Sequence, residues 1–188
     1  MPEDIHSRIA KRIKSLRIKR QMTLDQLAQT TQVSRAMLSL IERGESSPTA
    51  VLLEKVATGL GVTLAALFED PESASNPLVR ADERTSWCDP DTRYQRWNLS
   101  PPNYPSPLQL VKVILPSGAR VHYETQQREG AVYQQIWVLQ GSLKITLGDN
   151  TYLLHSDDCF AMQLNQTMTY YNPSQQDTHY LVAIANHS

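Results

Sequence analysis

Residues 22–49 read MTLDQLAQTTQVSRAMLSLIERGESSPT, and this stretch decides the fold of the front of the chain. Three hydroxyl residues, Thr23, Ser34 and Thr49, stand where a side chain can accept a hydrogen bond from the first turn of a helix. Thr23 also precedes Gln26 by three residues, which is the spacing of a capping box. The stretch therefore predicts helices that begin just after each of these hydroxyl residues.

The spacing of apolar residues supports this interpretation. The basic segment before Thr23 is counted as the first helix, so the helices that begin after Thr23 and Ser34 are the second and third. Only four residues, 30–33, separate these two, which is short enough for a helix-turn-helix. Gly44 stands where a helix end needs a residue that tolerates positive φ. The third helix would then be the element placed in the DNA major groove. Apolar residues recur at helical intervals of three and four on a later segment as well: Leu52, Leu53, Val56, Ala57 and Leu60.

Residues 7–68 resemble the lambda-repressor-like helix-turn-helix domain of the XRE family of transcriptional regulators. The Leu-Ala pair, the Val-Ser start of the third helix and its Ile-Glu-Arg-Gly end carry the resemblance. It implies an all-α, five-helix domain over residues 1–70 that binds double-stranded operator DNA. It also implies that Ser34, Arg35, Ala36 and Ser39 face the groove, and that Arg43, Ser46, Ser47 and Thr49 lie beside phosphates. Thr23 and Gln26 complete the set of candidate DNA-binding residues.

Two residues of the third helix can also be judged from their chemistry. Arg35 lies in its first turn, and a guanidinium can hold O6 and N7 of guanine together. Leu40 replaces a polar residue of many relatives. We interpret it as packing on a neighbour, because apolar helix residues are usually buried.

Basic residues are concentrated at the N-terminus. Seven of the first 20 residues are Lys or Arg, although the whole chain has a net charge of −1. Phosphate contacts supply most sequence-independent affinity for DNA, so a basic first helix fits a DNA-binding domain. A charge run alone more often marks a solvated helix face. The helix-turn-helix pattern favours DNA.

The composition fits a globular cytoplasmic protein. The chain has 188 residues and 40% hydrophobic content, enough for one large or two small domains. It has no apolar run of the roughly 18 residues that a membrane span needs. No export signal is expected. Cys88 and Cys159 are far apart, with no CxxC pair, and we interpret them as reduced thiols.

The pattern changes after Phe68. Residues 71–77 lie in a stretch of acids and turn-forming residues that predicts a linker. From Leu108 onward, short apolar segments separated by turns predict many antiparallel strands, as in a β-sandwich or small barrel. Hairpins are expected at Gln140 with Gly141 and at residues 148–150. A second domain over residues 78–188 is therefore expected.

Residues 108–185 resemble the cupin family, whose fold is an antiparallel β jelly-roll barrel. The segment IWVLQGSL, residues 136–143, carries most of this resemblance. The fold class expected for the whole chain is α+β with two domains.

The metal-binding pattern of the family is broken, because His122 is followed by Glu124 in place of a second histidine. Gln134 and Met168 replace the other two expected ligands.

A neutral amide and a thioether are poor ligands for the metals that imidazole and carboxylate hold. We therefore expect no metal, no cofactor and no enzymatic activity. Side chains alternate along strands, so Gln134 would point inward with Ile136, and Met168 with Tyr170. A pocket suited to a small polar effector, such as an amino acid or a sulfur compound, would be lined by six residues: His122, Glu124, Gln134, Ile136, Met168 and Tyr170.

The sequence thus predicts a cytoplasmic transcriptional regulator with a small-molecule effector. A homodimer is expected, because paired half-sites supply the affinity that one helix-turn-helix lacks. Two alternatives stay open: a metal-dependent cupin enzyme tethered to DNA, and an antitoxin-like module that binds a partner protein. A filled barrel that serves only as a dimer scaffold is a further possibility.

Overall fold

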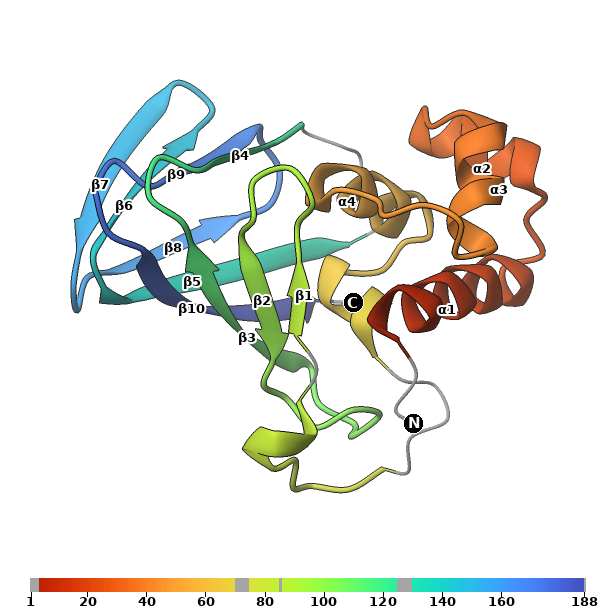
Figure 1. Cartoon of the computed structure of the whole chain (residues 1–188), viewed down its shortest axis with the longest axis horizontal. Coiled ribbons are helices and arrows are strands. Elements are labelled where there is room, and N and C mark those ends of the chain that lie inside the picture. The colour runs from red at the N-terminus through yellow and green to blue at the C-terminus, as the bar shows by residue number, and fades with distance from the viewer. Residues whose placement is uncertain (1–3, 70–74, 85, 125–129, 188) are drawn as a thin grey trace.

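The computed structural model describes residues 4–69, 75–84, 86–124 and 130–187, and the side chains up to residue 185. Helices form one side of the molecule and β-sheets form the other, with α4 lying between them (Figure 1). None of the helices in the described part of the chain is long and apolar enough to cross a membrane.

The helical part contains four α-helices and one 3-10 helix. The elements are α1 (Ile5–Lys19), α2 (Leu24–Thr31), α3 (Arg35–Glu42), α4 (Ala50–Gly59) and η1 (Leu64–Phe68). The expected fold class is confirmed. The fifth helix of the expected domain is the short η1, whose apolar side chains are buried.

The predicted helix starts are confirmed. Thr23 Oγ1 accepts a hydrogen bond from Gln26 N at 3.1 Å, and Gln26 Oε1 accepts one from Thr23 N at 2.8 Å. Ser34 caps α3 through Met37 N at 3.2 Å. Thr49 caps α4 in the same way. Each cap satisfies an amide that the helix itself leaves without a partner.

The basic residues of α1 are partly used inside the fold. Arg17 binds Glu42 of α3 through two contacts of 2.6 and 2.7 Å, with both side chains largely buried. Arg12 donates to Ala66 O at 3.1 Å and to Glu69 at 3.1 Å. These arginines join α1 to its neighbours, so the charge run of α1 is not simply a DNA-facing surface.

The β part consists of two antiparallel sheets that face each other, as expected for a jelly-roll barrel. The larger sheet has the order β1-β2-β3-β10-β5-β8, and the smaller has the order β4-β9-β6-β7. The strands of the larger sheet are β1 (Ser86–Cys88), β2 (Gln95–Asn98), β3 (Leu108–Leu115), β5 (Ala131–Gln140), β8 (Cys159–Gln163) and β10 (Thr178–His187). Those of the smaller sheet are β4 (Arg120–Tyr123), β6 (Ser142–Leu147), β7 (Asn150–His155) and β9 (Met168–Tyr171).

One expected hairpin is wrong. The turn at residues 148–150 joins the paired strands β6 and β7, but Gln140 and Gly141 join β5 to β6, which lie in different sheets. Gly141 has a φ of +89°, and a Cβ there would lie 3.1 Å from the Thr178 Cα. The glycine therefore permits a close crossing between the sheets, because it has no Cβ.

The two parts of the chain share several contacts. Phe68 of η1 lies against Trp87 of β1, with ring centroids 5.5 Å apart. Glu69 accepts a hydrogen bond from Gln109 of β3 at 2.7 Å. The expected linker 71–77 falls mostly outside the described residues. Its exact bounds, and those of the two domains, stay a prediction.

Candidate functional site

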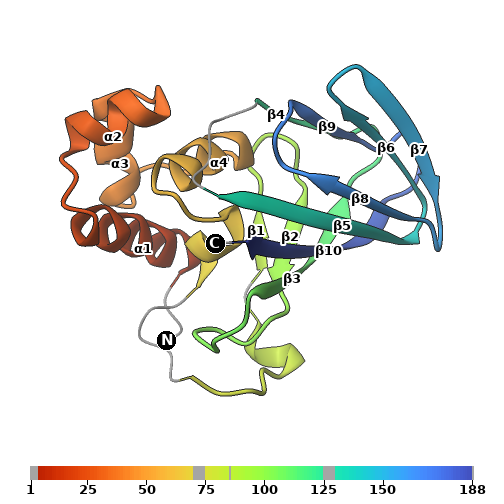
Figure 2. The same ribbon diagram turned by 180° about the vertical axis from the view of Figure 1, so that it is seen from behind.

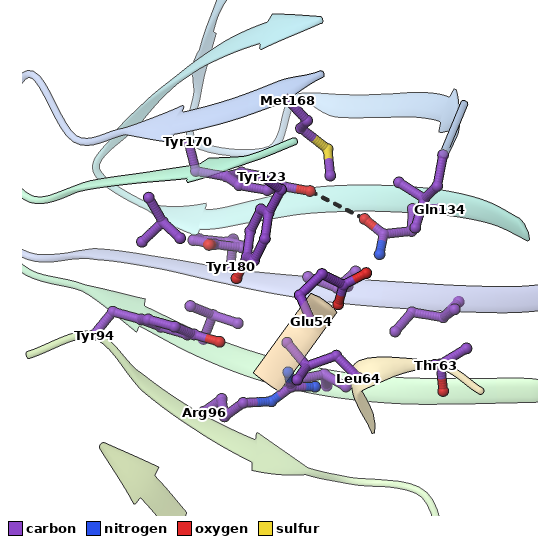
Figure 3. A pocket seen from close by; sticks show the side chains of 16 residues that line it. Glu54, Thr63, Leu64, Tyr94, Arg96, Tyr123, Gln134, Met168, Tyr170 and Tyr180 are labelled. Atoms are coloured by element: carbon purple, nitrogen blue, oxygen red, sulfur yellow. Dashed lines mark hydrogen bonds between the residues drawn. The ribbon is translucent and has the colours of Figure 1, made fainter. Parts of the chain in front are cut away.

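A cavity of about 70 Å³ lies inside the barrel, at the end that α4 and η1 cover. We call it the barrel chamber (Figure 3). Its wall is apolar on most sides and carries a few polar side chains. It is lined by Glu54, Thr63, Leu64, Tyr94, Arg96, Val111, Val113, Val121, Tyr123, Gln134, Leu164, Met168, Tyr170, Tyr180, Val182 and Ile184.

The helical part of the chain supplies one wall of the chamber. Glu54 projects from α4, and Thr63 and Leu64 come from the start of η1. In the view of Figure 3, Glu54 lies between the labelled side chains of Gln134 and Arg96. An acid on the helix-turn-helix part of the chain is thus part of the barrel's cavity.

Two contacts hold α4 at this place. The buried Asp89, between β1 and β2, accepts a hydrogen bond from Ala50 N at 2.6 Å. A carboxylate there also interacts favourably with the positive end of the helix. At the end of the barrel that α4 covers, Lys55 Nζ lies 2.8 Å from Glu124 Oε2.

Arg96 supplies the buried positive charge of the chamber. The residue is only 5% exposed, and its guanidinium lies 4.6 Å from the centre of the Phe68 ring. Among the described residues, Arg96 Nε has no hydrogen-bond acceptor. A buried donor without a partner costs free energy, so an acceptor at this position would be favourable.

Tyrosines surround these two charges. The Tyr170 hydroxyl donates to Gln134 Oε1 at 3.0 Å. Burial raises the pKa of Tyr170 well above its usual value, and the charge of Glu54 raises it further. Burial also raises the pKa of Tyr180, which the charge of Arg96 lowers in part. The two charges therefore act on the hydroxyls of the chamber in opposite directions.

The six predicted effector-binding residues divide into two groups. Gln134, Met168 and Tyr170 line the chamber. Ile136 is fully buried on the inner face of β5 but is not part of the chamber wall. His122 is exposed, and its Nδ1 lies 2.8 Å from Thr169 Oγ1. Glu124 pairs with Lys55 outside the chamber.

Sequence reasoning missed Glu54, Arg96, Tyr94, Tyr123 and Tyr180. The strand containing Tyr180 was predicted, and Tyr180 alternates with the apolar residues Val182 and Ile184, which was an available signal. Arg96 and Tyr94 lie in or next to β2, which was not predicted. Glu54 required the packing of α4 on the barrel, which no local pattern shows.

In the described ranges, no group of three or more His, Cys, Asp or Glu side chains lies close enough to hold a metal ion.

The candidate DNA-binding surface is the start of α3. Ser34, Arg35 and Ala36 are exposed there. Arg35 Nε lies 3.2 Å from Asp25 Oδ1 of α2, with both side chains more than half exposed. Exposed pairs of this kind contribute little free energy, so Arg35 can leave Asp25 for a base or phosphate.

Five further candidates lie in the C-terminal half of α3 or beyond it. Arg43 pairs with Glu45 at 2.8 Å and donates to Ser39 Oγ at 2.6 Å. Within the described part of the chain, Ser46 Oγ is buried without a hydrogen-bond partner. Ser47 is exposed, and the hydroxyl of Thr49 serves as the cap of α4.

An exposed recognition helix and an antiparallel barrel on one chain define a DNA-binding regulator with a second, barrel-shaped domain. Comparison with known proteins agrees with this class. Residues 13–67 match the family model described as helix-turn-helix. The chain is 30% identical over 174 residues to the HTH-type transcriptional regulator SutR of Escherichia coli (strain K12), which covers 89% of each chain. The chain therefore belongs to the helix-turn-helix family of transcriptional regulators.

A solved structure supports the same assignment over the full length. An HTH_3 family transcriptional regulator from Vibrio cholerae has a TM-score of 0.80 and 29% identity, and the match covers 98% of both chains. A 70-residue part of the chain is also similar to control protein C.MunI from Mycoplasma sp., with 37% identity over 37% of this chain and 95% of that protein.

Proposed function

We propose that this regulator is ligand-responsive and that the barrel chamber is its sensor for a small molecule. The observation that carries the proposal is the position of Glu54, which belongs to the helical DNA-binding part and lines the chamber of the barrel. A ligand that contacts Glu54 contacts both parts of the chain at once. Such a ligand can favour one placement of α4 over another, which is what a coupled binding equilibrium requires.

Seven of the ten candidate residues make the DNA contacts in this proposal. Ser34, Arg35, Ala36 and Ser39 read bases from α3, and Arg43, Ser46 and Ser47 approach phosphates. Thr23, Gln26 and Thr49 contribute chiefly by capping α2 and α4, because their side-chain oxygens are already used there. Caps of this kind fix the helix ends that approach the DNA backbone.

We also propose a cytoplasmic homodimer formed through the outer face of the larger sheet. Strands β3, β10 and β5 lie side by side (Figure 2). Their outward side chains include Leu110, Trp137 and Leu139, which are 36%, 46% and 38% exposed. Contiguous exposed apolar residues often mark protein interfaces. A second copy suits this face, because a two-fold dimer pairs the same apolar patch with itself and matches paired operator half-sites.

A thermal-shift screen of the full-length protein tests the sensor proposal. The panel contains amino acids, sulfur compounds, polyamines and divalent metals. A ligand that binds only the folded state adds about 2.7 kcal/mol of stability at a hundred times its Kd. Stabilisation by a small organic molecule is the expected result. Stabilisation by metals alone would favour the enzyme alternative, and stabilisation by none of the panel would contradict sensing.

A further inference from the structure

We infer that the ligand of the barrel chamber is a small zwitterion, an α-amino acid with a short side chain, whose carboxylate binds Arg96 and whose ammonium binds Glu54. This inference rests on the proposed sensor function and adds the chemical class of the ligand.

The guanidinium of Arg96 indicates the negative group of the ligand. Its guanidinium is buried, and its Nε donor has no acceptor among the described residues. Charged donors and acceptors make the strongest hydrogen bonds, and a guanidinium matches the planar geometry of a carboxylate. A carboxylate on the ligand would therefore supply the hydrogen-bond acceptor that Arg96 Nε lacks.

Glu54 is an acid of the chamber wall and comes from α4. A ligand with only a negative charge would enter beside the carboxylate of Glu54, and one with only a positive charge would enter beside Arg96. Either would place like charges together in an environment of low dielectric, where repulsion is strong. A ligand that carries both charges on neighbouring carbons avoids both repulsions.

Both charges act on the tyrosines of the chamber. Glu54 raises the pKa of Tyr170 beyond the effect of burial, and Arg96 lowers the burial-raised pKa of Tyr94 and Tyr180. The pKa of Tyr123 is raised by burial and by Glu54 and is lowered in part by Arg96, so both charges act within the same cavity. Apolar residues such as Met168 and Val182 remain for a short ligand side chain.

The volume of the chamber limits the size of the ligand. A cavity of about 150 Å³ accommodates benzene, which has six non-hydrogen atoms, whereas the chamber encloses about 70 Å³. Alanine also has six non-hydrogen atoms, so its binding requires the wall to move outward. The part of the wall that does not belong to the barrel is α4 with η1. Ligand binding would therefore displace α4, which packs against α2 of the helix-turn-helix.

Isothermal titration calorimetry of the full-length protein tests this inference with three matched ligands. L-Alanine carries both charges, L-alaninamide carries only the positive one, and propionate carries only the negative one. The expected result is that L-alanine binds about 10- to 100-fold more tightly than either analogue, as the loss of a hydrogen bond to a charged group predicts. Equal or tighter binding of either analogue would overturn the inference.

Two variants assign each charge to its partner. Arg96→Gln should weaken L-alanine and remove its advantage over L-alaninamide, while Glu54→Gln should remove its advantage over propionate. Asp149→Asn is the matched control, because it removes an exposed acid at the turn between β6 and β7, which lies away from the chamber and from α4 (Figure 1), and it should change the affinity less than twofold. An equal effect of Asp149→Asn and Glu54→Gln would contradict the assignment.

The results also separate this inference from the function on which it rests. A non-zwitterionic compound that stabilises the wild-type protein, while L-alanine does not, would overturn the zwitterion and keep the sensor. Binding of no small molecule at all would overturn both. The ligand comparison uses only wild-type protein, so it stays decisive even where a variant fails to fold.

Discussion

Replacing Asp89 with alanine tests how firmly α4 is fixed to the barrel. The Asp89 carboxylate is 2% exposed and accepts hydrogen bonds from Ala50 N at 2.6 Å, Thr92 N at 2.7 Å, Asp91 N at 3.0 Å and Thr92 Oγ1 at 3.0 Å. Ala50 is fully buried, so its amide would lose its partner without gaining water. The loop amides lie nearer the surface and can be hydrated instead.

The expected cost follows from these contacts. A hydrogen bond to a charged group contributes about 1.5–3 kcal/mol, and an orphaned buried amide costs a similar amount. Since the desolvation of the buried carboxylate offsets part of this, we expect a loss of about 3 kcal/mol in the free energy of unfolding. At roughly 2–4 °C per kcal/mol for a chain of this size, the Tm should fall by about 9 °C.

Urea denaturation followed by tryptophan fluorescence measures this loss. Trp87 is a suitable reporter, because it is buried between Phe68 of η1 and Tyr94 of the barrel. Asp91→Ala in the same loop is the control, since Asp91 is exposed and only its backbone amide binds Asp89. A change in Asp89→Ala no larger than the roughly 0.5 kcal/mol typical of surface substitutions would refute the role of Asp89 at α4.

Four further predictions concern other parts of the molecule. Arg35→Ala should cost about 1–3 kcal/mol in operator binding and relax the preference at one base pair, and an unchanged sequence preference in a selection from random duplexes would count against it. Glu42→Ala should lower stability by about 3–5 kcal/mol in urea denaturation, because it removes the carboxylate that neutralises the largely buried Arg17. Trp137→Lys should convert the dimer to a monomer in sedimentation experiments, and an unchanged mass would exclude this face. Alkaline titration followed at 295 nm should show that Tyr170 ionises later than exposed tyrosines. Its folded pKa lies above the unfolded value, so its contribution to stability is present below about pH 10 and is lost as the pH rises further.

The parts of the fold that depend on local chemistry could be predicted from sequence. The caps at Thr23, Ser34 and Thr49 are such cases, because each depends on one hydroxyl and an amide three residues away. The longer strands from Leu108 onward were also predictable from alternation. Strands β1 and β2 were missed because they are short and contain polar or aromatic residues.

The candidate site was less accessible to sequence reasoning. Because side chains alternate along a strand, the sequence predicted that Gln134, Met168 and Tyr170 point into the barrel. In the structure all three line the chamber. His122 and Glu124 were candidates through the family pattern, and they lie on the exposed side of β4 and beyond its end. Glu54 lies about 80 residues from Gln134 in sequence, so only the docking of α4 reveals it.

The central claim is that occupancy of the barrel chamber changes DNA binding through α4, and operator affinity measured with and without ligand tests it most directly. A fluorescently labelled duplex, selected from a random pool, is titrated with full-length protein by anisotropy at one fixed salt concentration. We predict that a saturating ligand of the chamber shifts the Kd by at least about fivefold, the lower end of typical coupling between sites. An unchanged Kd, with a ligand that calorimetry shows to be bound, would contradict the claim.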